Sequence, residues 1–130
     1  MPNEPSPKPT EAELEILQIL WQNGPSTVRF VNGLLSRQKE VGYTTTLKLM
    51  QIMNEKGLVS RDEDNRTHIY QANVSEQETQ QHLLGRFLNT AFRGSAMKLV
   101  MQALGNHQTS KEELDQIRQL LDQIEGGKKP

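Results

Sequence analysis

Apolar side chains recur at three- and four-residue intervals in the N-terminal half of the chain, a spacing that predicts amphipathic helices. Three helical stripes are marked by Leu14, Ile16, Leu17, Leu20 and Trp21, by Val28, Val31, Leu34 and Leu35, and by Thr46, Leu49, Met50 and Met53. Thr10-x-x-Glu13 has the form of a capping box for the first helix, and Ser26 is expected to cap the second. We therefore predict three short helices between residues 10 and 57.

The pattern changes after Lys56-Gly57, where the third helix is expected to stop. Residues 58–63 are predicted to form a strand, and residues 67–71 a return strand. Asp64-Asn65 supplies the turn, since Asp and Asn tolerate the positive φ of tight hairpins. Three helices followed by a hairpin is the order of a winged helix-turn-helix. The predicted fold class is mainly α with a small β wing.

Helical spacing returns after Asn73, with Ser75-x-x-Glu78 and Ser110-x-x-Glu113 as helix starts and Arg93-Gly94-Ser95 as a break. We predict three short helices there. A region of about 50 residues buries such apolar stripes poorly by itself. We therefore expect dimerisation, with packing back onto the N-terminal lobe as the alternative. The expected dimer interface is Leu83, Leu84, Phe87, Leu88, Phe92, Leu99, Val100, Leu104, Leu114, Ile117 and Leu121.

The same boundaries give the expected domain organisation. Residues 1–9, with four prolines, are a flexible tail. Residues 10–73 form the winged-helix domain, residues 74–125 the helical dimerisation domain, and residues 126–130 a second tail.

The polar face of the third helix favours binding to DNA. Thr44 and Thr45 lie in its first turn, where free backbone N–H groups and the helix dipole attract a phosphate. Lys48 can reach a phosphate or a guanine edge, and Leu47 is expected to point outward, toward thymine methyl groups of a major groove. The alternative is an ordinary amphipathic helix whose polar face contacts only water. The predicted DNA-binding residues are Thr27, Arg29, Thr44, Thr45, Leu47, Lys48, Gln51, Arg61 and Arg66.

Charge limits how strongly one copy can bind DNA. The 130 residues carry a net charge of −1, but from Arg29 to Arg66 seven basic residues face five acidic ones. Because phosphate contacts supply most non-specific affinity, one copy should bind weakly, and a dimer would gain from doubled contacts. The acidic balance also keeps open a second function class, a winged-helix module that binds proteins instead of DNA.

Several kinds of chemistry are not expected. The chain has no cysteine, and His68, His82 and His107 are scattered without a ligand partner at metal-site spacing. No nucleophile–base pattern or glycine-rich phosphate loop is present, so we expect neither an enzyme nor a bound cofactor or metal. No apolar run has membrane-spanning length and no signal segment opens the chain, so we expect no membrane insertion and a cytoplasmic protein.

The order and spacing of these motifs resemble a known family over about residues 10–124. The residues that carry the resemblance are Thr10, Glu13, Ile19-Leu20-Trp21, Gly24-Pro25-Ser26-Thr27-Val28, Tyr43-Thr44-Thr45, Lys56-Gly57-Leu58-Val59, Arg61, Arg66, Tyr70, Phe87-Leu88, Phe92, Gly94 and Leu99-Val100. They resemble the penicillinase and methicillin-resistance repressors of bacteria. The resemblance implies a homodimeric repressor on palindromic operators, induced by a membrane sensor-protease that cuts the dimerisation region.

This chain departs from that family pattern at two places. Ile52-Met53 stands where the family often has Arg-Leu, which removes one basic residue from the third helix. The family's Asn-Phe cleavage pair aligns roughly with Gln102-Ala103, which marks the expected region of proteolytic inactivation. The absence of cysteine argues against the copper-responsive relatives, which carry a Cys-rich tail.

Overall fold

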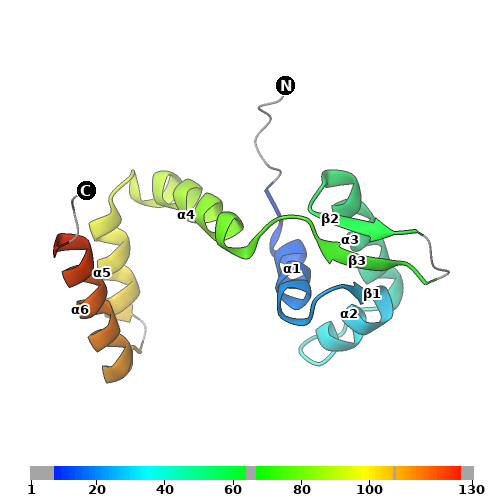
Figure 1. Ribbon diagram of the computed structural model, residues 1–130, viewed down its shortest axis with the longest axis horizontal. Helices are drawn as coiled ribbons and strands as arrows, with labels where there is room; N and C mark the ends of the chain where they lie inside the picture. The colour runs from blue at the N-terminus through cyan, green and yellow to red at the C-terminus, as the bar shows by residue number, and fades with distance from the viewer. Residues whose placement is uncertain (1–7, 64–66, 107, 127–130) are drawn as a thin grey trace. The chain divides into compact units, whose positions relative to one another are not determined.

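The computed structural model describes residues 8–63, 67–106 and 108–126. Its elements are α1 (Glu11–Asn23), β1 (Ser26–Thr27), α2 (Val28–Leu35), α3 (Tyr43–Lys56), β2 (Val59–Asp62), β3 (Ile69–Ala72), α4 (Glu76–Phe92), α5 (Ala96–Asn106) and α6 (Lys111–Gly126), as Figure 1 shows. The chain divides into two compact units, Met1–Leu84 and Gly85–Pro130. Six helices and a small antiparallel sheet within the described residues confirm the predicted fold class.

The core of the first unit lies between α1, α2, α3 and the sheet. Its buried members are Ile16, Leu17, Leu20, Val28, Val31, Leu35, Met50, Met53, Leu58, Val59 and Tyr70. The predicted capping box at the start of α1 is confirmed. Glu13 N donates to Thr10 Oγ1 at 3.1 Å, and Thr10 N donates to Glu13 Oε1 at 3.0 Å. Members of all three predicted helical stripes meet in this core, whereas Leu34, which was also expected there, is only half-buried and is not part of the core cluster.

The start of α2 differs from the expectation that Ser26 caps it. The N-cap is Thr27, whose Oγ1 accepts from Phe30 N at 3.1 Å. The Ser26 hydroxyl instead donates to Gly24 O at 2.8 Å, and Ser26–Thr27 form the short strand β1. The predicted cap was one residue early: Ser and Thr are both favoured caps, and the Ser26 hydroxyl is used at Gly24 while Thr27 caps the helix.

The wing is part of a three-stranded antiparallel sheet in the order β1-β3-β2. Tyr70 pairs with Ser26 on one side and with Arg61 on the other. β2 and β3 are shorter than predicted, and the residues expected to turn the hairpin, Asp64-Asn65, lie outside the described residues. Gly57 ends α3 at φ 85°, a left-handed conformation that suits glycine and lets β2 begin at once.

The first turns of α4 belong to the first unit. Trp21 Nε1 donates to Val74 O at 2.9 Å, and the buried Thr79 hydroxyl donates to Ser75 O at 2.7 Å. The division between the units falls within α4, after Leu84, which is later than the boundary expected after Asn73. The change from strand to helix at Asn73 marks the end of the wing, and packing continues past it.

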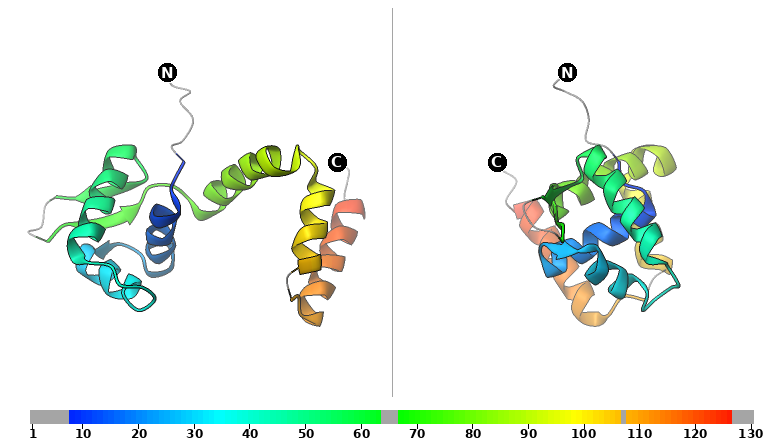
Figure 2. Two further views of the ribbon diagram at one scale, coloured as in Figure 1. Left: turned by 180° about the vertical axis from the view of Figure 1, so that it is seen from behind. Right: turned by 90° about the vertical axis from the view of Figure 1, so that its right-hand side faces the viewer.

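The second unit contains the end of α4 with α5 and α6. Arg93 and Gly94 turn the chain after α4, at φ 52° and 84°. Ser95 and Ser110 cap the next two helices, accepting from Lys98 N at 3.1 Å and Glu113 N at 3.0 Å. Figure 1 and the left view of Figure 2 show that α5 and α6 run in opposite directions. None of residues 85–105 and 108–126 is buried.

Candidate nucleic-acid interface

One face of α3 is held in the core and the opposite face is exposed. Thr46, Met50 and Met53 are fully buried. Asn32 Nδ2 donates to Thr46 Oγ1 and to Val41 O, both at 2.9 Å, so α2 fixes the rotation of α3. The outward positions are Thr44, Thr45, Lys48 and Gln51, all exposed as expected. No carboxylate interrupts α3 before Glu55. This face can therefore approach a polyanion without repulsion.

The first turn of α3 has backbone donors that the chain itself does not cap. Gly42 is its N-cap and makes no side-chain capping hydrogen bond. Thr44 and Thr45 are the second and third residues of the helix, and both are exposed. Free N–H groups at a helix N-terminus, with the positive end of the helix dipole, form a site for a phosphate oxygen.

Leu47 was expected to point fully outward, and the structure corrects this. Its side chain is partly buried and packs against the core cluster. It lines a cleft of about 280 Å³ together with Val28, Tyr43 and Tyr70. Periodicity placed Leu47 off the buried stripe of α3, but the neighbouring elements cover part of that flank. Leu47 is thus a boundary residue, with only part of its side chain available to a ligand.

The predicted contacts at the start of α2 lie at the same cleft. Thr27, the N-cap of α2, and Arg29 in its first turn line the cleft, and Thr67 and His68 line it just before β3. The Arg29 guanidinium carbon is 5.5 Å from the centroid of the Tyr43 ring. Tyr43 and His68 were not among the predicted contacts. The placement of Tyr43 directly before Thr44 and Thr45, in the first turn of a helix, was the available signal.

Arg61, the predicted contact on β2, is already engaged within the wing. Its Nη2 atom lies 2.7 Å from Glu63 Oε2. This hydrogen bond is the main cause that lowers the pKa of the Glu63 carboxyl, and the charge of Arg61 contributes less. The same hydrogen bond is the main cause that raises the pKa of Arg61, and the neighbouring Tyr70 hydroxyl contributes less. The Tyr70 hydroxyl is buried and has no hydrogen-bond partner among the described residues. Arg66, the other predicted wing contact, lies outside the described residues.

Ion pairs within the first unit reduce the number of basic side chains available to a ligand. Lys39 pairs with Glu15 at 3.1 Å and Lys56 with Glu13 at 2.7 Å, in addition to the pair formed by Arg61. Arg29, Arg37 and Lys48 form no ion pair with any residue that the structure describes. Lys48 on α3 and Arg29 at the cleft are therefore the described cations best placed to meet an anion.

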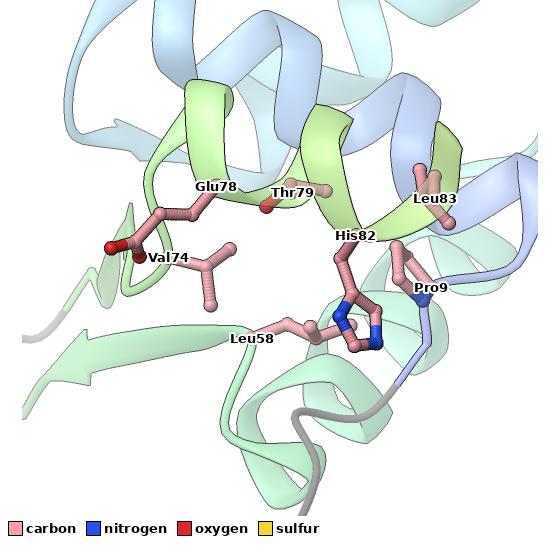
Figure 3. A pocket seen from close by; sticks show the side chains of 7 residues that line it. All are labelled: Pro9, Leu58, Val74, Glu78, Thr79, His82 and Leu83. Carbon is pink, nitrogen blue, oxygen red and sulfur yellow. The ribbon is translucent and has the colours of Figure 1, made fainter. Parts of the chain in front are cut away.

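A second cleft, of about 210 Å³, lies where α4 begins (Figure 3). Figure 3 shows His82 pointing from α4 toward Leu58 and Pro9, while Thr79 lines the cleft beside Val74. Its lining is mostly apolar.

Across residues 8–63, 67–106 and 108–126, no group of three or more His, Asp or Glu side chains is placed to hold a metal ion. None of the described helices is long and apolar enough to cross a membrane.

The helices of the second unit expose part of the predicted dimer interface. Six apolar side chains on this unit's helices are more than half exposed: Phe87, Met97, Met101, Leu120, Leu121 and Ile124. Of the predicted interface, Leu84, Val100 and Leu104 are also exposed, whereas Leu83, Leu88, Phe92, Leu99, Leu114 and Ile117 are half-buried. Phe87 and Phe92 make an edge-to-face contact at 5.6 Å. Met97, Met101, Leu120 and Ile124 extend the apolar surface beyond the predicted set.

Comparison with known proteins gives one consistent family. The penicillinase repressor family model matches residues 9–123. The penicillinase repressor of Bacillus licheniformis is 25% identical over 123 residues, which are 95% of this chain and 96% of that protein. The methicillin resistance regulatory protein MecI of Staphylococcus aureus (strain N315) is 23% identical over 113 residues, 87% of this chain and 92% of that protein.

The winged-helix part also has a counterpart among solved structures. The DNA-binding domain of the repressor BlaI superposes with a TM-score of 0.51 at 21% identity, covering 58% of this chain and 92% of that domain. This likeness confirms the fold of the covered part. Because the family model extends over nearly the whole chain, from residue 9 to residue 123, the protein belongs to the penicillinase repressor family.

Proposed function

We propose that this protein is a homodimeric transcriptional repressor that binds a palindromic operator. In this proposal α3 enters the major groove and the β2–β3 hairpin lies on the DNA backbone. The observation that carries the proposal is the exposed face of α3. Thr44, Thr45, Lys48 and Gln51 face outward from a helix whose opposite face is fixed in the core. Side chains of these types bind phosphates and base edges.

The family supports this assignment. The relatives named above are a penicillinase repressor and a regulatory protein of methicillin resistance. Bacterial operators lie in the cytoplasm, where we place this protein. We assign no catalytic step to the chain.

Each residue of the interface has a separate role in the proposal. Thr44 and Thr45, at the uncapped start of α3, bind a phosphate, and Lys48 and Gln51 reach into the groove. Thr27 and Arg29 bind the backbone beside the cleft, and Leu47 contributes the exposed part of its side chain. Arg61 contributes only if it leaves Glu63, since the two form an ion pair within the wing.

The second unit supports the homodimer. None of residues 85–105 and 108–126 is buried, and six of the large apolar side chains of this unit are more than half exposed. A folded helical unit without a core of its own is stabilised by burying apolar area against a second copy. Dimerisation also places two α3 helices on two half-sites, which compensates for the few free cations of each copy.

Inactivation by a membrane sensor-protease, which the family resemblance implies, would act on this dimer. The expected region of cleavage, Gln102 and Ala103, is exposed but lies inside α5. A protease needs an extended segment, so cleavage there requires local unwinding of α5. Cutting α5 would divide the dimerisation unit and release the operator.

Fluorescence anisotropy tests the proposed function directly. The full chain is titrated into a labelled duplex from upstream of its own gene and into a scrambled duplex of equal composition, each at several salt concentrations. We expect the upstream duplex to bind tighter by at least about a thousand-fold, in the range of specific recognition. Equal binding to both duplexes, or none to either, would favour the protein-binding module instead.

A further inference from the structure

The contact between Arg29 and Tyr43 joins the starts of two helices. Arg29 is the second residue of α2 and Tyr43 is the first residue of α3. The guanidinium carbon lies 5.5 Å from the ring centroid, within the range of a cation–π interaction. Both side chains are exposed, so the contact buries little area and adds little to stability. Its main consequence is that the ring restricts where the Arg29 guanidinium can lie.

The surroundings of this pair suit an anion. The cleft beside it is bordered by the start of α2, the start of α3 and the residues before β3. Arg29, Thr27 and His68 line it, and none of its described lining residues is a carboxylate. Arg29 also forms no ion pair with any described residue, unlike Lys39, Lys56 and Arg61. The guanidinium is therefore held in place without being neutralised.

We propose that Tyr43 is a positioning residue that holds the Arg29 guanidinium for one phosphate of the DNA backbone. A guanidinium that lies over an aromatic ring keeps the N–H groups along its edge free to donate to two phosphate oxygens. The ring restricts an otherwise mobile side chain before DNA arrives, so less conformational entropy is lost on binding. This inference rests on the proposed operator binding, and it adds Tyr43 to the residues on which affinity depends.

A double-mutant cycle tests the role of Tyr43. Operator affinity is measured across salt for the full-length wild type, Tyr43→Leu, Arg29→Ala and the double variant, with Tyr43→Phe retaining the ring. Tyr43→Leu should weaken binding by about two- to five-fold, the range of an exposed cation–π contact, and Tyr43→Phe should stay near the wild type. Arg29→Ala should lower the salt slope by about one per monomer. In the Arg29→Ala background, Tyr43→Leu should then have no further effect.

Arg37→Ala is the matched control, because it removes an exposed arginine just after the end of α2 that does not line the cleft. In that background Tyr43→Leu should keep its full effect. An unchanged affinity of Tyr43→Leu, or an equal loss with and without Arg29, would overturn the inference while leaving operator binding intact. A wild-type chain that binds neither duplex would overturn the proposed function and this inference together.

Discussion

The Nζ atom of Lys56 lies 2.7 Å from Oε1 of Glu13, which joins the last residue of α3 to the first turn of α1. The same carboxylate oxygen accepts from Thr10 N and closes the capping box of α1. Glu13 is 3% exposed and Lys56 is 30% exposed. One buried carboxylate therefore stabilises the start of α1 and fixes the end of α3.

Replacing Lys56 by methionine should destabilise the first unit, because it leaves the buried Glu13 charge without its partner. We expect a loss of about 1–3 kcal/mol in the free energy of unfolding, measured by urea denaturation. Lys39→Met is the control, since Lys39 and Glu15 form an exposed pair that should contribute less than about 1 kcal/mol. Equal losses in the two variants would contradict a structural role for the Glu13–Lys56 pair.

The wing should show a pH dependence that originates in Glu63. The Arg61 hydrogen bond lowers the pKa of Glu63 in the folded chain, so this pair stabilises the fold at neutral pH. Its contribution should disappear as the pH falls from the ordinary glutamate range through the lowered pKa. A carboxyl-carbon NMR titration of Glu63 measures this midpoint. Arg61→Gln should raise it toward the ordinary value, and a midpoint that does not respond to Arg61→Gln would refute the pairing.

Lys48→Ala should weaken operator binding without unfolding the chain, because Lys48 is exposed on α3 and forms no ion pair with a described residue. If Lys48 meets a phosphate, the slope of log affinity against log salt should decrease by about one per monomer. Lys98→Ala removes an exposed lysine from α5 and serves as the control. The assignment of Lys48 fails if both variants bind like the wild type.

Leu121→Asp should convert the protein to monomers. Leu121 is 58% exposed on α6, so the substitution disturbs little packing inside one chain, whereas it would bury a charge in a dimer. Sedimentation velocity should show a dimeric wild type, a monomeric variant and a dimeric control, Gln119→Asp, on the polar side of the same helix. A wild type that sediments as a monomer at tens of micromolar, roughly ordinary assay concentrations, would exclude the proposed dimer.

The helices of this protein were predictable because their signals are local. Thr10 and Glu13 are three residues apart, and the capping box they form is present in the structure. Strand β1 was not predicted, since two residues show no alternation and the strand exists only through pairing with Tyr70 and Ile69. The hairpin was predicted as a unit, while the ends of its strands were set by sheet pairing.

The candidate interface was predicted as a face of α3, and its details depend on contacts that periodicity does not describe. The spacing placed Lys48 outward correctly. It also placed Leu47 outward, but Leu47 is partly buried and lines the cleft together with Tyr43 and Tyr70. The contact between Arg29 and Tyr43 joins α2 to α3, and the ion pair between Arg61 and Glu63 forms within the wing. Which cations remain available to DNA is therefore a property of the fold.

Hydroxyl-radical footprinting of the full chain on the DNA upstream of its own gene tests operator binding by a dimer most directly. We predict protection of two half-sites related by two-fold symmetry, with centres about one helical turn, or a multiple of it, apart. The protected backbone sugars of both half-sites should lose protection together as the salt concentration rises. A single protected half-site, or uniform protection without any preferred sequence, would contradict the account.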